Sequence, residues 1–202
     1  MKYLIAGLGN IGEEYRNTRH NVGFMVLDAA AAASNISFKD SRYGFVAEMR
    51  YKGSSFILLK PSTYMNRSGN AVRYWLQKEK ITPENLLVIT DDIAIPAGTM
   101  RLRAKGGHGG HNGLASISEI LGTDEYARLR VGIGNTYPRG GQVNYVLGQW
   151  TPEELAIMKK RMPLAVEIIL SFGTAGCELT MTAYNKAGKT LPDNDPDSGK
   201  DR

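Results

Sequence analysis

The stretch YLIAGLGNIG, residues 3–12, decides how the chain begins to fold. Four apolar residues lead into Gly7, Gly9 and Gly12. An apolar run bounded by glycine is typical of a short buried strand that ends in a sharp turn, so we expect a strand over residues 2–7. The glycines also follow the G-x-G-x-x-G spacing of a dinucleotide-binding turn. The turn is therefore a candidate phosphate site, and the residues that follow it decide between the alternatives.

The residues after the third glycine argue against a dinucleotide. In that motif a helix begins within the glycines and points its N-terminus at the pyrophosphate, whereas here the helical period begins only near Val22. Glu13 and Glu14 place two carboxylates where the pyrophosphate must lie, and Asp28 falls inside the predicted helix instead of binding a ribose. We expect no cofactor, and a turn whose glycines take positive φ and let a substrate approach Asn10.

Composition places the chain among ordinary globular proteins of one domain. Its 202 residues are 42% hydrophobic and 22% charged. No window approaches the roughly 18 apolar residues of a membrane span, and the N-terminus lacks the features of a signal peptide. The single cysteine, Cys177, excludes an internal disulfide and is expected in the core. We expect a cytoplasmic protein with one domain over residues 1–186 and a disordered polar tail over residues 187–202.

Positive charge is concentrated in two segments that contain no acidic residue. Residues 93–118 contain Arg101, Arg103 and Lys105, and residues 126–151 carry three arginines as their only charges. Arg101 and Arg103 are two apart on a predicted strand, so they point the same way. These segments indicate a polyanionic partner, although solvated surface charge is an equal alternative from composition alone.

Strands and helices alternate along the chain. Strands are expected over residues 2–7, 43–51, 55–60, 86–91, 99–104 and 128–134, with a hairpin turn at 52–54. Helices are expected over residues 22–33, 68–79 and 114–121, and from Thr151 onward. Asn17 or Thr18 is placed to cap the first helix, and Pro163 should kink or split the last. The pattern predicts an α/β fold, a single globular domain with a mixed β-sheet flanked by helices.

Polar loops follow three of these strands. The first carries Asn10 and ends at His20 and Asn21, and the segment PSTYMNRSG, residues 61–69, carries Tyr64, Met65 and Asn66. Ligand-facing groups usually lie at the carboxyl ends of strands in open α/β sheets. Each loop taken alone is better explained as a turn or a helix cap than as a ligand site.

The segment TDDIAIPAG, residues 90–98, comes at the end of the expected strand over residues 86–91 and supplies Asp91. Adjacent acids can bind a metal or orient a histidine. The three histidines of the chain show no metal-binding spacing, so we expect no metal, and a carboxylate that orients an imidazole is the better use.

The most unusual segment is KGGHGGHNG, residues 105–113, in which glycines surround His108 and His111 and precede Asn112. Such a loop can direct backbone amides toward an anion and adds little to packing. A histidine, an orienting carboxylate and amide donors are sufficient to activate water against an ester and to stabilise the oxyanion.

Five motifs, in order, resemble the bacterial-type peptidyl-tRNA hydrolases. They are GLGNIGEEYRNTRHNVG, KPSTYMNRSG, DDIAIPAG, GGHGGHNGL and RLRVGIG, and the likeness spans nearly the whole chain apart from its tail. The resemblance implies a monomeric peptidyl-tRNA hydrolase-like (phosphorylase/hydrolase-like) fold. It also implies metal-free hydrolysis of the ester between a peptide and the terminal ribose of tRNA, which recycles tRNA after interrupted translation.

The resemblance also implies roles for single residues. His20 is similar to the family's general base, Asp91 to the carboxylate that stabilises it, and Asn10 to the residue that engages the peptide main chain. The implied contacts with the peptide or the tRNA are Tyr15, Asn21, Tyr64, Met65, Asn66, His111 and Asn112, with Arg101, Arg103 and Arg130 for tRNA phosphates.

The chain departs from the family pattern at two positions. Ile11 stands where proline is usual, and Ala94 stands where an acid is common, which favours Asp91 as the functional carboxylate. Two alternatives remain open at this point. A non-catalytic RNA-binding protein would bind in a salt-dependent way without turnover, and a nucleotide-cofactor enzyme would bind NAD or FAD saturably.

Overall fold

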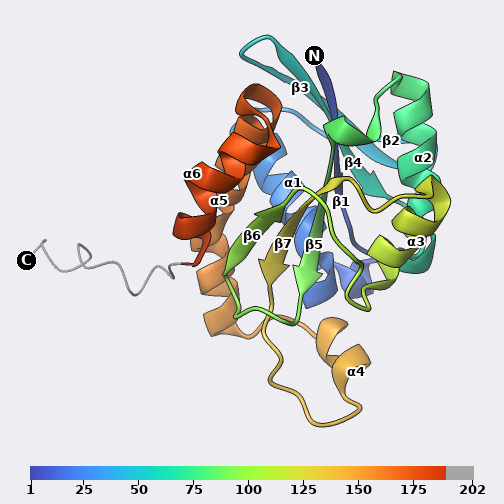
Figure 1. The fold of residues 1–202 in the computed structure, drawn as a ribbon. Helices are drawn as coiled ribbons and strands as arrows, with labels where there is room; N and C mark the ends of the chain where they lie inside the picture. The colour runs from blue at the N-terminus through green and yellow to red at the C-terminus, as the bar shows by residue number, and fades with distance from the viewer. Residues whose placement is uncertain (190–202) are drawn as a thin grey trace, which may run out of the picture.

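A computed structural model describes residues 1–189, which form a seven-stranded sheet flanked by helices (Figure 1). The strand order is β2-β3-β4-β1-β5-β7-β6. The strands are β1 (Lys2–Gly7), β2 (Lys39–Ser41), β3 (Gly44–Tyr51), β4 (Ser54–Pro61), β5 (Leu86–Asp92), β6 (Met100–Arg103) and β7 (Ala127–Gly132). The four central strands β4, β1, β5 and β7 are parallel, while β2, β3 and β6 pair antiparallel at the two sides. The predicted mixed sheet and the β3–β4 hairpin are confirmed.

The central strands are buried on both faces. On β1, Tyr3 and Ile5 belong to one hydrophobic cluster and Leu4 and Ala6 to the other. This alternation follows from the period of a strand, and the double burial explains why β1 reads as a continuous apolar run.

Helices cover both faces of the sheet (Figure 1). The larger cluster lies under α1 (Val22–Ala33) and α5 (Pro152–Ala175), and the second lies under α2 (Ser68–Glu79) and α3 (Asn112–Leu121). The remaining helices are α6 (Cys177–Lys189), which packs beside β6, and the short α4 (Gln142–Val146), which lies beyond the carboxyl ends of β5 and β7. Single 3-10 turns are η1 (Glu13–Tyr15), η2 (Arg19–Asn21), η3 (Met65–Arg67) and η4 (Pro83–Asn85). Within the described residues, no helix is long and apolar enough to cross a membrane.

The glycines of the opening stretch act differently from the expectation. Of the three glycines only Gly12 has a positive φ, whereas Gly7 and Gly9 pack against α1. A Cβ on Gly7 would lie 2.3 Å from the carbonyl oxygen of Gly23, and one on Gly9 would lie 2.8 Å from the ring of Phe24. These two glycines therefore let the start of α1 pack directly on the end of β1.

Three details of the helices correct the sequence prediction. Helix α5 begins with the expected Thr151 cap but runs through Pro163 without a break, and the chain turns instead at Gly176. Neither Asn17 nor Thr18 caps α1, because η2 lies between them and the helix. Residues 187–189 are the last turn of α6, so a boundary at residue 187 is too early. The rest of the expected tail lies outside the described residues.

Candidate active site

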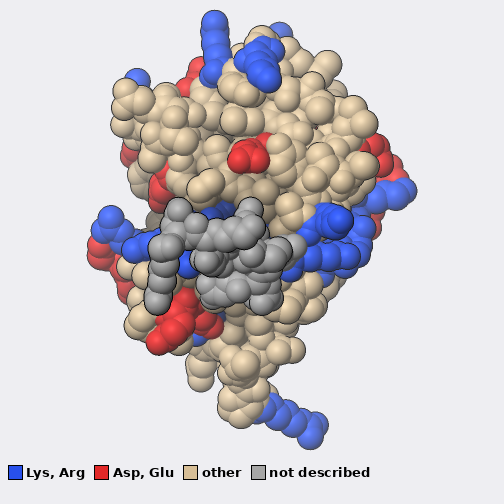
Figure 2. Space-filling model, turned by 90° about the vertical axis from the view of Figure 1, so that its left-hand side faces the viewer, with Lys and Arg blue, Asp and Glu red and all other residues tan. Residues whose placement is uncertain are grey.

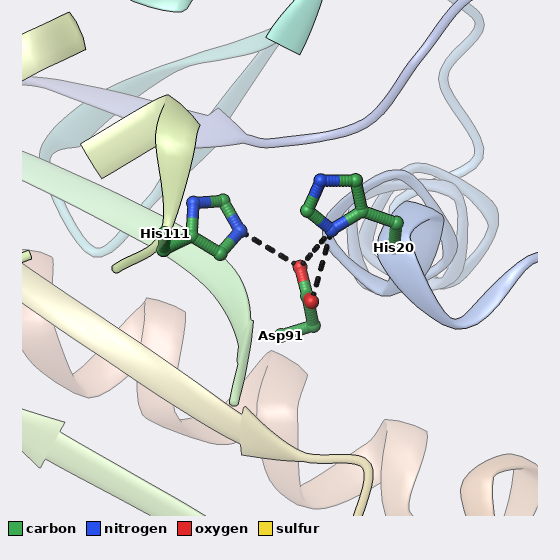
Figure 3. A group of neighbouring side chains, drawn as sticks. All are labelled: His20, Asp91 and His111. Atoms are coloured by element: carbon green, nitrogen blue, oxygen red, sulfur yellow. Dashed lines mark hydrogen bonds and ion pairs between the residues drawn. The ribbon is translucent and has the colours of Figure 1, made fainter. Parts of the chain in front are cut away.

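His20 and Asp91 meet at the carboxyl edge of the sheet (Figure 3). His20 lies in η2, just before α1, and Asp91 lies near the end of β5. The Nδ1 atom of His20 is 2.9 Å from both carboxylate oxygens of Asp91, and both side chains are buried. Because Nδ1 donates to the carboxylate, the network assigns the lone pair of His20 to Nε2, which points away from Asp91 in Figure 3. Among the described residues, Nε2 has no hydrogen-bond partner, so its lone pair is available to accept a proton.

A second imidazole, that of His111, contacts the same carboxylate. Its Nε2 lies 2.9 Å from Oδ1 of Asp91, while its Nδ1 accepts from the backbone amides of Gly113 and Leu114. His111 is therefore the N-cap of α3, and this cap fixes its tautomer with the proton on Nε2. The resemblance placed His111 among the substrate contacts, and the structure places it on the carboxylate of Asp91.

The two imidazoles keep Asp91 ionised. Burial acts to raise the pKa of this carboxyl, because desolvation disfavours the charged form. The positive potential and hydrogen bonds of His111, and then those of His20, outweigh burial and hold the pKa below its ordinary value. Asp91 is thus a carboxylate that accepts from both rings.

Asn10 is held by two neighbours that the sequence also singled out. Its backbone N–H donates to Oδ1 of Asn21 and its carbonyl accepts from Nδ2 of Asn21, both at 2.8 Å. Its side-chain Oδ1 accepts from the backbone N–H of Met65 at 3.1 Å. Asn21 directly follows His20, so this clamp ties the end of β1 to the turn that carries the imidazole and to the loop after β4.

The other predicted contact residues differ in exposure. Tyr64 and Asn66 lie exposed around η3, Met65 is buried, Asn112 is exposed at the start of α3, and Tyr15 is half-buried in η1. The exposed side chains are free to meet a ligand. The buried Met65 shapes the site through its backbone and its packing.

A cavity of about 420 Å³ opens beside His20 and Asp91. Its wall includes the glycine loop of residues 105–111, with Asn112 after it, and side chains of α4. Its basic lining residues are Arg103, Lys105, Arg128 and Arg130. Arg101 lies on the same side of β6 as Arg103 but is not among the lining residues.

The two arginines of β7 in this wall have different surroundings. Arg128 is 2% exposed and donates to the carbonyls of Gly107 and Asp124, so it supports the glycine loop from within. Burial lowers the pKa of Arg128. Arg130 is partly exposed and ion-paired with Asp92. The sequence could not separate the two, because both appear only as arginines in an acid-free segment.

Lys and Arg side chains also lie on the outer surface, away from the cavity. On the face that α5 and α6 present, Lys and Arg side chains form separate groups with Asp and Glu among them (Figure 2). The cavity wall, with its four basic side chains, is the candidate for binding phosphate.

Sequence reasoning missed Arg19 and Glu154, which form a shielded ion pair at 2.8 Å beside His20. They are 135 positions apart, so no local pattern could pair them. It also missed that His20, Asp91 and His111 bring three ligand atoms within 4.8 Å of one another. That grouping has the composition of a three-ligand metal site, which spacing in the sequence had argued against.

Comparisons with known proteins agree on one family. A family-wide profile described as peptidyl-tRNA hydrolase matches residues 4–192. The chain is 62% identical over 186 residues to the peptidyl-tRNA hydrolase of Phocaeicola vulgatus, covering 92% of this chain and 100% of that protein. It is 61% identical to the peptidyl-tRNA hydrolase of Bacteroides fragilis, with the same coverage. The crystal structure of peptidyl-tRNA hydrolase from Acinetobacter baumannii is similar with a TM-score of 0.85 and 32% identity, covering 94% of this chain and 95% of that chain.

Proposed function

The chain belongs to the peptidyl-tRNA hydrolase family and hydrolyses peptidyl-tRNA, and from this premise we propose that His20 is its general base. The observation that carries the proposal is the pair of 2.9 Å contacts between His20 Nδ1 and the Asp91 carboxylate. They leave Nε2 to take a proton from water, and they stabilise the imidazolium that forms.

In the proposed reaction, His20 Nε2 removes a proton from water as the oxygen attacks the ester carbonyl. The carbonyl electrons move to its oxygen and form a tetrahedral intermediate. When the intermediate collapses, the bond to the ribose oxygen breaks, and the imidazolium returns the proton to that leaving oxygen. The products are a peptide carboxylic acid and a tRNA with a free terminal hydroxyl.

Asn10 and Asn66 are the proposed amide donors. The Oδ1 of Asn10 is occupied by the amide of Met65, so its Nδ2 is oriented to donate to a peptide carbonyl. Asn66 follows Met65 on the same turn and is exposed, which suits a donor to the developing oxyanion. Asn21 acts by holding Asn10, and His111 acts by fixing Asp91.

The tRNA end is proposed to lie against the cavity and the loops beside it. Tyr15 and Tyr64 offer rings for stacking, and Asn112 at the cavity wall offers an amide. Arg103 and Arg130 in the wall, with Arg101 beside them, are the proposed phosphate contacts. Because Arg130 is paired with Asp92, a phosphate there must compete with a carboxylate. We also propose that the protein acts as a monomer in the cytoplasm, where translation produces its substrate.

Peptide release tests the proposal. We expect the protein to hydrolyse N-acetyl-aminoacyl-tRNA much faster than the unblocked aminoacyl-tRNA, because Asn10 engages the peptide main chain. His20→Ala is expected to lower kcat by at least about 10²-fold, the lower range for loss of a general base. A His20→Ala protein that is as active as the parent overturns the role of His20.

A chelator separates acid–base catalysis from metal catalysis at the same three side chains. We expect activity to survive EDTA, since the two imidazoles already share one carboxylate by hydrogen bonds. Loss of activity that zinc or magnesium restores would instead identify His20, Asp91 and His111 as metal ligands. Gel filtration of the active protein tests whether it is a monomer in solution.

A further inference from the structure

Arg19, the residue before His20, is a buried cation with an elaborate set of partners. Its side chain is 9% exposed, and its guanidinium donates to both carboxylate oxygens of Glu154, at 2.8 and 3.4 Å. It also donates to the carbonyl of Tyr145 at 3.1 Å and lies 4.2 Å from the centre of the Tyr145 ring. Both partners lie far along the sequence from Arg19, Tyr145 in α4 and Glu154 in the first turn of α5.

The backbone joins the same two segments. The N–H of Arg19 donates to the carbonyl of Gly148, and Thr18 forms an isolated β-bridge with Gln149. The N–H of Trp150 donates to the carbonyl of Asn17. Residues 17–19, which directly precede His20, are thus paired through their backbone with residues 148–150.

The chain leaves room for this guanidinium. A Cβ at Gly148 would lie 2.9 Å from Nη1 of Arg19, closer than side chains normally approach. Gly148 has no positive φ, so backbone conformation does not explain why a glycine stands at this position. The close approach of Arg19 and of neighbouring carbonyls does.

The anchored segment also reaches the cavity. Val143 and Val146 of α4 line the cavity wall with His20, and Arg19 holds the intervening Tyr145 by its carbonyl and its ring. On the other side of His20, Asn21 is clamped to Asn10. The imidazole is therefore fixed by one anchor on each side of it in sequence.

We propose that Arg19, anchored by Glu154, is a positioning residue that sets the imidazole of His20 against Asp91. The proposal rests on the proposed role of His20 as general base. A shielded ion pair adds little net stability, because desolvation of both charges offsets their attraction. Its contribution here is geometric, and a displacement of about 1 Å in a reacting group can cost about 10²-fold in rate.

The test compares variants that remove the anchor with one that only weakens α5. Arg19→Met removes the charge and keeps most of the apolar stem, and Arg19→Lys keeps the charge but loses the two-pronged contact. Glu154→Gln keeps a side-chain oxygen that can accept from the amide of Thr151 and loses the ion pair. Thr151→Ala removes the α5 cap and leaves Arg19 and Glu154 in place, so it is the matched control.

We expect Arg19→Met and Glu154→Gln each to lower kcat on N-acetyl-aminoacyl-tRNA by about tenfold or more, with KM within about twofold of the parent. The double variant should lose no more than the stronger single variant, because both changes break one contact. Arg19→Lys should recover part of kcat, and Thr151→Ala should leave kcat unchanged. A rise in KM with unchanged kcat, or additive losses in the double variant, overturns the proposal.

The His20→Ala background decides whether Arg19 acts through His20. If it does, adding Arg19→Met to His20→Ala leaves the residual rate unchanged; an equal further loss identifies a merely structural role and overturns the proposal. Should Arg19→Met fail to fold, Glu154→Gln carries the same comparison. A fully active His20→Ala protein would refute the general base itself, an outcome distinct from failure of the anchor.

Discussion

Two segments bring a histidine to Asp91, and they are built in opposite ways. The turn that carries His20 is buried and tied by Arg19 to residues 145–154 and by Asn21 to Asn10. The loop that carries His111 is largely exposed. Apart from adjoining residues of the chain, nothing lies within 4 Å of the Cβ position at four of its glycines, namely Gly106, Gly107, Gly109 and Gly110. His111 caps α3 at the end of this loop, and Arg128 donates to the carbonyl of Gly107 beneath it. Apart from the contact of His111 with Asp91, its other hydrogen bonds and ion pairs among the described residues either lie within the loop or join it to Asp124 and Glu125.

In the mechanism that we propose, this difference separates the reacting histidine, His20, from the supporting one, His111. A base must hold its nitrogen in place against water and substrate, so its turn is fixed by long-range contacts. A ring that only donates to Asp91 needs a fixed tautomer, and a local helix cap supplies that. The open loop is then free to form the cavity wall.

The largest expected effect comes from comparing the two histidines by substitution. His20→Ala removes the base, with the loss of at least about 10²-fold given above. His111→Asn should lose only about tenfold in kcat, because asparagine can still cap α3 while Asp91 loses one donor. Steady-state kinetics on N-acetyl-aminoacyl-tRNA measure both. Equal losses in the two variants would contradict the division between base and support.

How much of this site the sequence predicts depends on how far apart the contacting residues are along the chain. The strand ends, the hairpin and the α5 cap are local patterns. The parallel strands β1 and β5 bring Asn10 and Asp91 to one edge of the sheet. Met65 and Asn66 follow β4, so their place beside Asn10 also follows from a parallel sheet.

The rest depends on contacts between distant residues. Arg19 and Glu154 are 135 positions apart, and the burial of Arg128 but not Arg130 depends on what covers β7. The role of the glycines in the opening stretch was predicted wrongly for the same reason, because it also depends on contacts with another element. Their spacing resembles a phosphate-binding turn, but Gly7 and Gly9 are small because α1 packs on them.

Glycine substitutions test the same contrast through stability. Gly7→Ala forces a Cβ to within 2.3 Å of the backbone oxygen of Gly23, and neither backbone can move without shifting α1. We expect it to lower the free energy of unfolding by about 3 kcal/mol or more. Gly107→Ala, where nothing lies within 4 Å and φ is not positive, should change it by less than about 1 kcal/mol. Urea unfolding measures both, and a strongly destabilised Gly107→Ala would show that the loop is packed after all.

The smallest expected effect is the pH dependence that the two histidines impose on Asp91. The folded protein holds the pKa of this carboxyl below its ordinary value, so the ionised form stabilises the fold above about pH 4, the usual range for aspartate. That contribution is lost as pH falls through the lower pKa of the folded state.

Asp91→Asn removes the contribution of the ionised carboxylate at every pH. The difference in free energy of unfolding between parent and Asp91→Asn should therefore be about 2 kcal/mol at pH 7, as for hydrogen bonds to a charged group, and should shrink below pH 4. Glu119→Gln, at an exposed carboxylate on α3, is the control and should show no such change. A difference that grows as pH falls would mean that burial, and not the two imidazoles, dominates Asp91.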